Sequence, residues 1–64
     1  MVKINGTEQD AAGKTVAEIV TAGGYNRAQV AVERNEEIVP KAQYDAVTVQ
    51  DGDVIEIVQF VGGG

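Results

Sequence analysis

The residues best placed for chemistry are the three glycines that close the sequence, Gly62, Gly63 and Gly64. They follow an apolar stretch, residues 54–61, whose β-branched side chains favour a strand. Glycine has no Cβ and keeps both signs of φ accessible, so side-chain packing cannot hold such a tail. Fully extended, three residues reach roughly 10 Å. We therefore expect Gly62 and Gly63 to thread into a partner's active site and the Gly64 carboxylate to be the reactive group; an ordinary frayed terminus is the alternative.

The residue types that are missing exclude other kinds of chemistry. The 64 residues include no Cys and no His, which excludes a thiolate zinc site, a cysteine nucleophile and a Ser-His-Asp triad. Two acidic pairs, Glu36/Glu37 and Asp51/Asp53, suggest metal binding or acid–base catalysis. Each pair lies in or beside a predicted turn without a third ligand in sequence reach, so we interpret them as solvated turn charges. We expect no catalytic residue, no metal and no bound cofactor in this chain.

Charge and hydropathy narrow the class of partner. Ten acidic residues stand against five basic ones, for a net charge of -5, and the basic residues form no run. This pattern disfavours nucleic acid and anionic membranes and favours a partner with a basic docking face. No apolar run approaches the roughly 20 residues of a membrane span, and the sequence enters a strand without a leader. We therefore expect a soluble, cytoplasmic protein that is a monomer when free.

The first half of the chain predicts a hairpin followed by a helix. Residues 1–4 alternate like a half-buried strand, Asn5-Gly6 predicts a type I′ turn, and residues 7–11 return antiparallel. Thr15 and Glu18 then fit a capping box at the start of a helix. The helix should lie on a sheet through an apolar stripe and should end at Gly23-Gly24. The residues of that stripe are Val16, Ile19, Val20 and Gly23.

The second half predicts a second hairpin and a closing strand. Residues 29–34 should form a third strand, Asn35 a turn, and residues 36–39 a short fourth strand. Pro40 lacks an N–H and keeps that fourth strand from a central position. Residues 41–45 predict a single helical turn, and residues 51–53 a polar turn that leads into the last strand.

The two faces of the last strand predict different contacts. We expect Ile55 and Ile57 to face the helix, because a two-layer domain has one dry side. Val58 and Phe60 then lie on the open face, where a small apolar patch usually marks a contact site, so we predict that they dock a partner. The alternative is that Phe60 folds against Tyr44 or a neighbouring strand.

The order of these elements predicts an α+β fold of the β-grasp type. A mixed four- to five-stranded sheet would carry one main helix packed on one face and a short helical turn. The helical crossover makes the last strand a parallel neighbour of the first. Residues 1–61 would form the domain, and residues 62–64 a flexible C-terminal glycine tail.

Several short motifs, taken together, carry a family resemblance. They are Ala-Val-Glu-Arg-Asn-Glu-Glu-Ile-Val-Pro at residues 31–40, Tyr44, Val-Gln-Asp-Gly-Asp at residues 49–53, and the closing Phe-Val-Gly-Gly-Gly at residues 60–64. In this order the chain resembles the ThiS family of sulfur-carrier proteins of thiamine biosynthesis over essentially its whole length. Gly62 is an addition ahead of the Gly-Gly pair and lengthens the flexible part.

The resemblance implies a mechanism in which the chain is a co-substrate and not an enzyme. A ThiF-like adenylating enzyme would use ATP to convert Gly64 to an acyl-adenylate. A persulfide from a cysteine desulfurase or a rhodanese-like donor would then yield a Gly64 thiocarboxylate, whose sulfur goes to thiazole synthase. Three alternatives stay open: a sulfur carrier for another pathway, such as molybdopterin synthesis or tRNA thiolation, a ubiquitin-like protein modifier, and an interaction domain with an inert tail.

Overall fold

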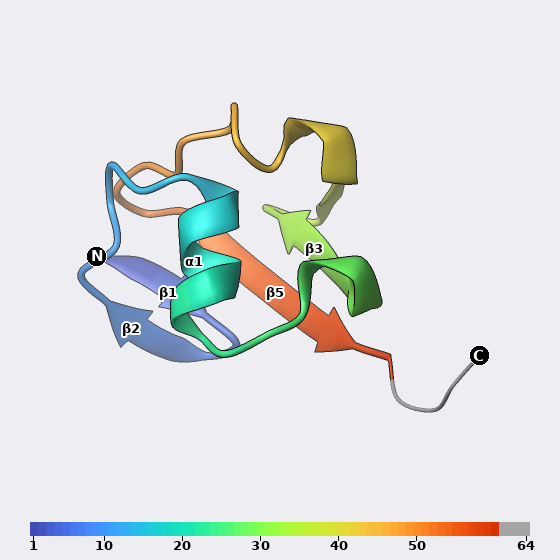
Figure 1. Cartoon of the computed structure of the whole chain (residues 1–64). Helices are drawn as coiled ribbons and strands as arrows, with labels where there is room; N and C mark the ends of the chain where they lie inside the picture. The colour runs from blue at the N-terminus through green and yellow to red at the C-terminus, as the bar shows by residue number, and fades with distance from the viewer. Residues whose placement is uncertain (61–64) are drawn as a thin grey trace.

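The fold is a five-stranded mixed sheet with one α-helix packed across one face (Figure 1). A computed structural model describes residues 1–60 of the chain. The strands lie in the order β2-β1-β5-β3-β4, and β5 pairs parallel with β1 and antiparallel with β3. The elements are β1 (Val2–Ile4), β2 (Thr7–Gln9), α1 (Val16–Ala22), the 3-10 helix η1 (Arg27–Gln29), β3 (Val30–Arg34), β4 (Glu37–Val39), the 3-10 helix η2 (Lys41–Gln43) and β5 (Val54–Gln59). This arrangement confirms the predicted α+β, β-grasp architecture.

Both hairpins close through two-residue turns with positive φ. Asn5 and Gly6 have φ of 49° and 84°, and Asn35 and Glu36 have φ of 52° and 70°. Positive φ at both central positions matches the right-handed twist of the flanking strands. The second turn corrects our prediction that the fourth strand begins at residue 36. Glu36 occupies the second turn position, so β4 begins at Glu37.

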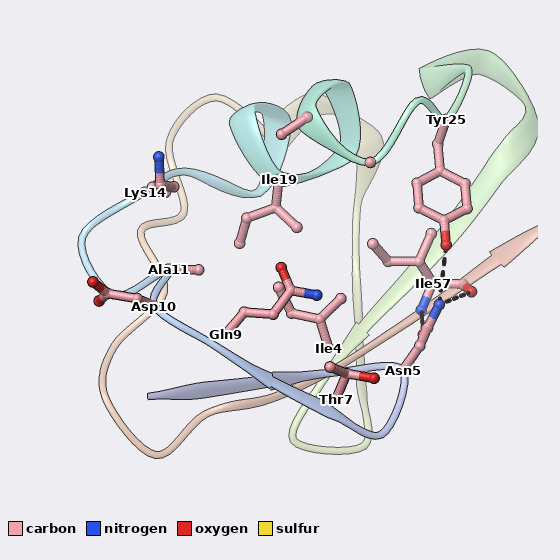
Figure 2. Close-up of a pocket in the computed structure, with 12 residues that line it drawn as sticks. Ile4, Asn5, Thr7, Gln9, Asp10, Ala11, Lys14, Ile19, Tyr25 and Ile57 are labelled. Atoms are coloured by element: carbon pink, nitrogen blue, oxygen red, sulfur yellow. Dashed lines mark hydrogen bonds between the residues drawn. The ribbon is translucent and has the colours of Figure 1, made fainter.

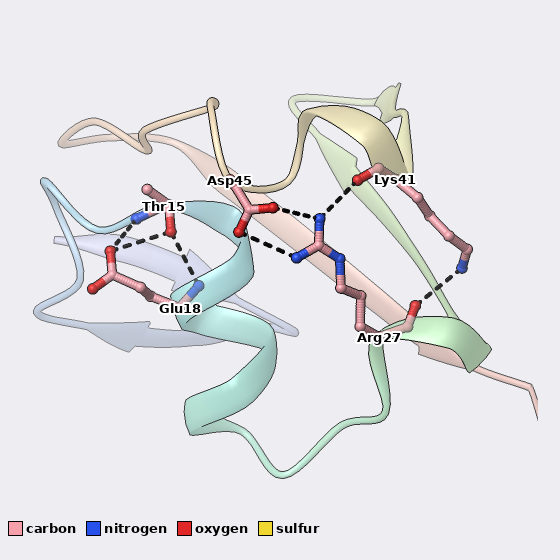
Figure 3. A network of polar contacts seen from close by, with 5 residues as sticks. All are labelled: Thr15, Glu18, Arg27, Lys41 and Asp45. Carbon is pink, nitrogen blue, oxygen red and sulfur yellow. Dashed lines mark hydrogen bonds and ion pairs between the residues drawn. The ribbon is translucent and has the colours of Figure 1, made fainter.

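The helix begins and ends where the sequence predicts. The Glu18 N–H donates to Thr15 Oγ1 at 3.1 Å, and the Thr15 N–H donates to Glu18 Oε1 at 2.9 Å, which completes the capping box (Figure 3). The hydrogen bonds that the Thr15 N–H and the Thr15 hydroxyl donate to Glu18 Oε1 hold the pKa of the Glu18 carboxyl below its ordinary value. At the other end Gly23 keeps a helical φ of -79°, and Gly24 provides the left-handed residue with φ of 78°.

The core is a single layer between α1 and the sheet. Ile55 is fully buried and Ile57 nearly so, which confirms that this face of β5 is directed at the helix. Because β5 is the central strand and has neighbours on both sides, its buried face anchors the whole layer. The buried apolar residues are Val2, Ile4, Ala11, Val16, Ile19, Val20, Val30, Val32, Val39, Tyr44, Val49, Ile55 and Ile57.

Local contacts change two other predicted boundaries. The strand predicted from residue 29 begins at Val30, because Asn26 caps a 3-10 turn in which the Ala28 N–H donates to Asn26 Oδ1 at 2.9 Å. The return strand predicted over residues 7–11 ends at Gln9, and Ala11 is buried in the core. The predicted helical turn over residues 41–45 is present as η2 and the turn that follows it. Among residues 1–60, no helix combines the length and apolar character that a membrane span requires.

Candidate functional site

The candidate site is the C-terminal half of β5 together with the residues that follow it. The structure places two of the five predicted site residues, Val58 and Phe60. The other three, Gly62, Gly63 and Gly64, lie outside the described residues, so their threading and sulfur-carrying roles stay predictions. The boundary proposed at residue 61 also lies outside the described residues.

The side chain of Val58 is exposed on the sheet face that the helix leaves open, and the side chain of Phe60, which directly follows β5, is exposed as well. Their exposed fractions are 55% and 58%. The Phe60 N–H nevertheless donates to the Gln29 carbonyl at 2.8 Å, so the backbone is held while the side chain is free. Tyr44 belongs to the buried core. The docking role of Phe60, and the alternative that it folds against Tyr44 or a neighbouring strand, both stay predictions.

A polar network fixes the start of β5. Asp53 is nearly buried, and its carboxylate accepts hydrogen bonds from Arg34 Nε at 2.8 Å, Asn35 Nδ2 at 3.1 Å and the Gln50 N–H at 2.8 Å. Asn35 also uses its Oδ1 to accept from the Val54 N–H at 2.9 Å. Our interpretation of Asp53 as a solvated turn charge is therefore wrong. It is the centre that joins the second hairpin turn to the loop before β5.

The same network sets the ionisation of Asp53. Burial by itself would raise the pKa of the carboxyl. The hydrogen bonds from Gln50, Arg34 and Asn35 and the positive charge of Arg34 outweigh burial, so the pKa of Asp53 lies below its ordinary value. Asp53 therefore stays ionised in the fold at neutral pH as a structural anion.

A second asparagine holds β5 from its other edge, as Figure 2 shows. Asn5 N–H donates to the Ile55 carbonyl at 2.9 Å, and Asn5 Oδ1 accepts from the Ile57 N–H at 2.7 Å. Asn5 Nδ2 donates to the Ile57 carbonyl at 3.3 Å and to Tyr25 Oη at 3.1 Å. The Asn5 amide thus continues the hydrogen-bond ladder of β1 after the strand itself has ended.

A groove lies between the first hairpin and α1, on the face of the sheet that the helix covers (Figure 2). Its volume is about 370 Å³. Lys14 and Asp10 lie at one end of the groove, and Asn5 and Tyr25 at the other. Its apolar wall includes Ile4, Ala11, Ile19 and Ile57. Among residues 1–60 no group of three or more acidic side chains could hold a metal ion.

Arg27 and Lys41 tie the two 3-10 helices together (Figure 3). The Arg27 guanidinium donates to both Asp45 carboxylate oxygens, at 2.8 and 3.2 Å, and to the Lys41 carbonyl at 3.0 Å. It also lies 5.2 Å from the centre of the Tyr44 ring. Lys41 Nζ donates to the Val30 carbonyl at 2.6 Å and to the Arg27 carbonyl. These contacts fix η1, whose Gln29 receives the end of β5.

The sequence did not predict that Asn5, Asn35 and Arg34 hold β5 in place through their side-chain hydrogen bonds. It identified both asparagines as turn formers and gave Arg34 no role. The one available signal was that asparagine, unlike glycine, brings an amide to a positive-φ turn. Nothing in the sequence shows which strand that amide reaches.

The parallel pairing of β1 with β5, the single covering helix and the open opposite face define a β-grasp domain whose last strand leads toward a glycine segment. Comparison with known proteins extends this class to a family. The model of the ThiS family matches residues 2–64. The chain therefore belongs to the ThiS family.

Individual relatives agree with this family. The chain is 46% identical over 50 residues to the sulfur carrier protein ThiS of Bacillus subtilis, covering 78% of this chain and 76% of that protein. It is 52% identical over 62 residues to a thiazole synthase of Paramagnetospirillum magneticum, covering 95% of this chain but 19% of that protein's length. The crystal structure of a thiamine biosynthesis protein (ThiS) from Geobacter metallireducens superposes with a TM-score of 0.75 at 37% identity, covering 98% of this chain and 97% of the other.

Proposed function

We propose that this protein is a sulfur carrier for the formation of the thiazole of thiamine, and that Gly64 is the residue that carries the sulfur. The observation that carries this proposal is the family match, which runs through residue 64 and so includes the glycine segment. The curated relative from Bacillus subtilis is named a sulfur carrier protein, which supports the same role. The described domain supplies the frame, and the glycine segment supplies the reactive end.

The proposed chemistry begins with activation, because a free carboxylate is a poor electrophile. A ThiF-like adenylating enzyme joins the Gly64 carboxylate to the α-phosphate of ATP and releases pyrophosphate. The terminal sulfur of a persulfide, supplied by a cysteine desulfurase or a rhodanese-like protein, then attacks the Gly64 carbonyl carbon, and AMP leaves. Reductive cleavage of the remaining S–S bond by a thiol leaves Gly64 as a thiocarboxylate.

The chain's own part in these steps is presentation. Gly62 and Gly63 add no side chain that would widen the segment as it enters an active site. Val58 lies in β5 and Phe60 directly follows that strand, and both offer an exposed apolar contact ahead of the glycine segment. ATP is bound by the adenylating partner, and the carrier acts as a co-substrate. This division agrees with the absence of Cys and His from the sequence.

The proposed acceptor of the sulfur is a thiazole synthase. Two proteins named thiazole synthase match this chain over about a fifth of their own length, so a domain of this kind forms part of each. A carrier domain in the same polypeptide as its acceptor supports a working contact between the two. In this transfer the thiocarboxylate sulfur is the nucleophile, and the carrier returns with its carboxylate.

The proposal is tested by intact-protein mass spectrometry after incubation with a ThiF-like enzyme, ATP and a persulfide donor. We expect the mass that corresponds to one oxygen exchanged for sulfur. The matched control lacks Gly63 and Gly64 and should show no exchange. It should unfold at the same temperature, because the buried core of the described residues 1–60 lies within residues 2–57.

Two outcomes contradict the proposal. One is sulfur loading of the truncated control, and the other is a native protein whose mass shows residues beyond Gly64. Adducts on lysine residues of other proteins, stable to reducing agents, would instead identify a protein modifier. Transfer of the loaded sulfur to a thiazole synthase then distinguishes the thiamine pathway from other sulfur-carrier pathways.

A further inference from the structure

The open face of the sheet has an apolar end and an acidic end, and the strand register shows where each lies. Residues that oppose each other across two strands share a face. Val58 therefore lies beside Ala31, and Glu56 lies beside Glu33. Glu33 in turn lies beside Ile38 on β4. The acidic end is thus two residues along β5 from Val58, on the same face.

Glu33 and Glu56 are like charges placed directly opposite each other. Both side chains are exposed, and like charges in this position destabilise a sheet. Among residues 1–60 the cations of the ion pairs are the Met1 amino group, Arg27 and Arg34, and none of them pairs with either glutamate. The free domain therefore carries an unfavourable pair that an external cation would relieve.

The pair forms part of a shallow depression that we name the acidic hollow. Its volume is about 280 Å³. Asn35 brings no charge to it, and the Asn35 amide is already hydrogen-bonded to Asp53 and to the Val54 N–H. The residues that line the hollow are Glu33, Asn35, Glu36, Val54 and Glu56.

The chemistry of the acidic hollow favours an arginine over a lysine. A guanidinium presents several N–H donors in a plane and can bridge two carboxylates on adjacent strands, whereas an ammonium is a point charge. Val54 is 41% exposed and offers the hollow an apolar surface. The aliphatic stem of an arginine can lie on such a surface while its head stays polar.

We propose that the acidic hollow receives an arginine side chain of the ThiF-like adenylating enzyme, which docks on Val58 and Phe60. This inference rests on the proposed function, because that function supplies the partner. Charge complementarity supports this inference. The chain has a net charge of -5, and Glu33 and Glu56, which form no ion pair within residues 1–60, lie opposite each other on the docking face. The apolar end gives contact area, and the acidic end orients the partner and speeds encounter.

The test is the affinity of the ThiF-like enzyme for the double variant Glu33→Gln/Glu56→Gln, measured by calorimetry at low and at moderate salt. We expect the affinity to fall about tenfold or more and to depend less on salt. The matched control is Glu8→Gln. It also removes a glutamate charge from the open face, but Glu8 lies opposite a cation, Lys3, and not opposite another glutamate. Its affinity should stay within about twofold of the unaltered protein.

Thermal unfolding separates lost docking from lost folding. Glu33→Gln removes the like-charge contact and should raise the Tm by about 1–4 °C at low salt. Glu8→Gln removes a favourable contact with Lys3 and should leave the Tm unchanged or slightly lower. A double variant that melted lower than the unaltered protein would contradict the like-charge argument.

An NMR titration with N-acetylarginine amide tests the hollow without any partner. We expect amide shifts at residues 33 and 56 that are absent in the double variant and weaker with the corresponding lysine compound. Sulfur loading with unchanged enzyme affinity in the double variant would overturn this inference and leave the proposed function standing. Failure of loading together with a positive arginine titration would overturn the function and leave the hollow as a guanidinium site.

Discussion

At the residue scale, Asp53 shows how one carboxylate can organise a turn. Arg34 and Asn35 come from the second hairpin, and Gln50 comes from the loop before β5. Three donors around one nearly buried anion leave little freedom in the direction in which the chain enters the last strand. The direction of β5 in turn sets where Val58 and Phe60 lie on the open face.

We expect Asp53→Asn to lower the free energy of unfolding by roughly 1–3 kcal/mol, because it removes an anion from three donors and leaves Arg34 without its partner. Urea unfolding at pH 7 measures the loss. The control Asp10→Asn makes the same change at an exposed position and should stay within about 0.5 kcal/mol of the unaltered protein.

The same residue predicts how stability depends on pH. The folded-state pKa of Asp53 lies below its ordinary value near 3.8, so ionised Asp53 stabilises the fold above that value. The contribution is lost as the pH falls from about 5 through the folded pKa. Asp53→Asn should therefore flatten the acid limb of the stability curve. An acid limb of unchanged steepness in this variant would contradict the role that we assign to Asp53.

At the element scale, β5 is held in place by groups outside the strands. The ladder between β1 and β5 contains two residue pairs, Lys3 with Val54 and Ile4 with Ile55. Asn5 extends that ladder, because its side-chain amide accepts from Ile57 N–H and donates to the Ile57 carbonyl. Without this extension, β5 would lack a hydrogen-bonding partner on this side from Ile57 onward.

We expect Asn5→Gly to lower the free energy of unfolding by about 1–2 kcal/mol, measured by urea unfolding. Glycine tolerates the positive φ at this position, so the loss reports the amide contacts with β5 and Tyr25 rather than backbone strain. The control is Glu36→Gly in the other hairpin turn. Glu36 has φ of 70° and an exposed side chain, so this change should be neutral or stabilising. Equal losses in the two variants would contradict the ladder extension by Asn5.

At the scale of the whole molecule, the domain is a frame with one dry face and one open face. The helix and the core occupy the dry face, and the exposed apolar side chains of Val54 and Val58 lie on β5 at the open face. A surface that binds a partner transiently has this character, because the free protein must carry the patch without unfolding. The acidic end on the same face suits a basic partner.

We expect Phe60→Ala to lower kcat/KM for sulfur loading by roughly tenfold or more, because exposed aromatic side chains often dominate binding energy. Its stability should stay within about 0.5 kcal/mol of the unaltered protein, because Phe60 is 58% exposed. The control is Thr21→Ala at an exposed position of α1, which covers the opposite face of the sheet, and its kcat/KM should be unchanged. Unchanged rates of adenylation and sulfur transfer in the Phe60 variant would contradict the docking role of Phe60.

Features that depend on neighbouring residues could be predicted from the sequence alone. Asn5-Gly6 predicts its turn, Thr15 with Glu18 predicts the start of the helix, and the alternation through Ile55 and Ile57 predicts the buried face of β5. In each case the interacting groups are separated by a few residues or by a fixed period, so local geometry suffices. These signals were enough for the β-grasp topology and for the exposed positions of Val58 and Phe60.

Only the tertiary structure decided the features that join distant parts of the chain. The buried Asp53 carboxylate accepts a hydrogen bond from Arg34, which lies 19 residues away in the sequence and belongs to another strand. Glu33 faces Glu56 because the antiparallel register of β3 and β5 places them opposite each other. Asn5 reaches Ile57 across 52 residues. Periodicity shows which face a residue occupies but not its partner, because the partner depends on strand order and register, which are properties of the packed sheet.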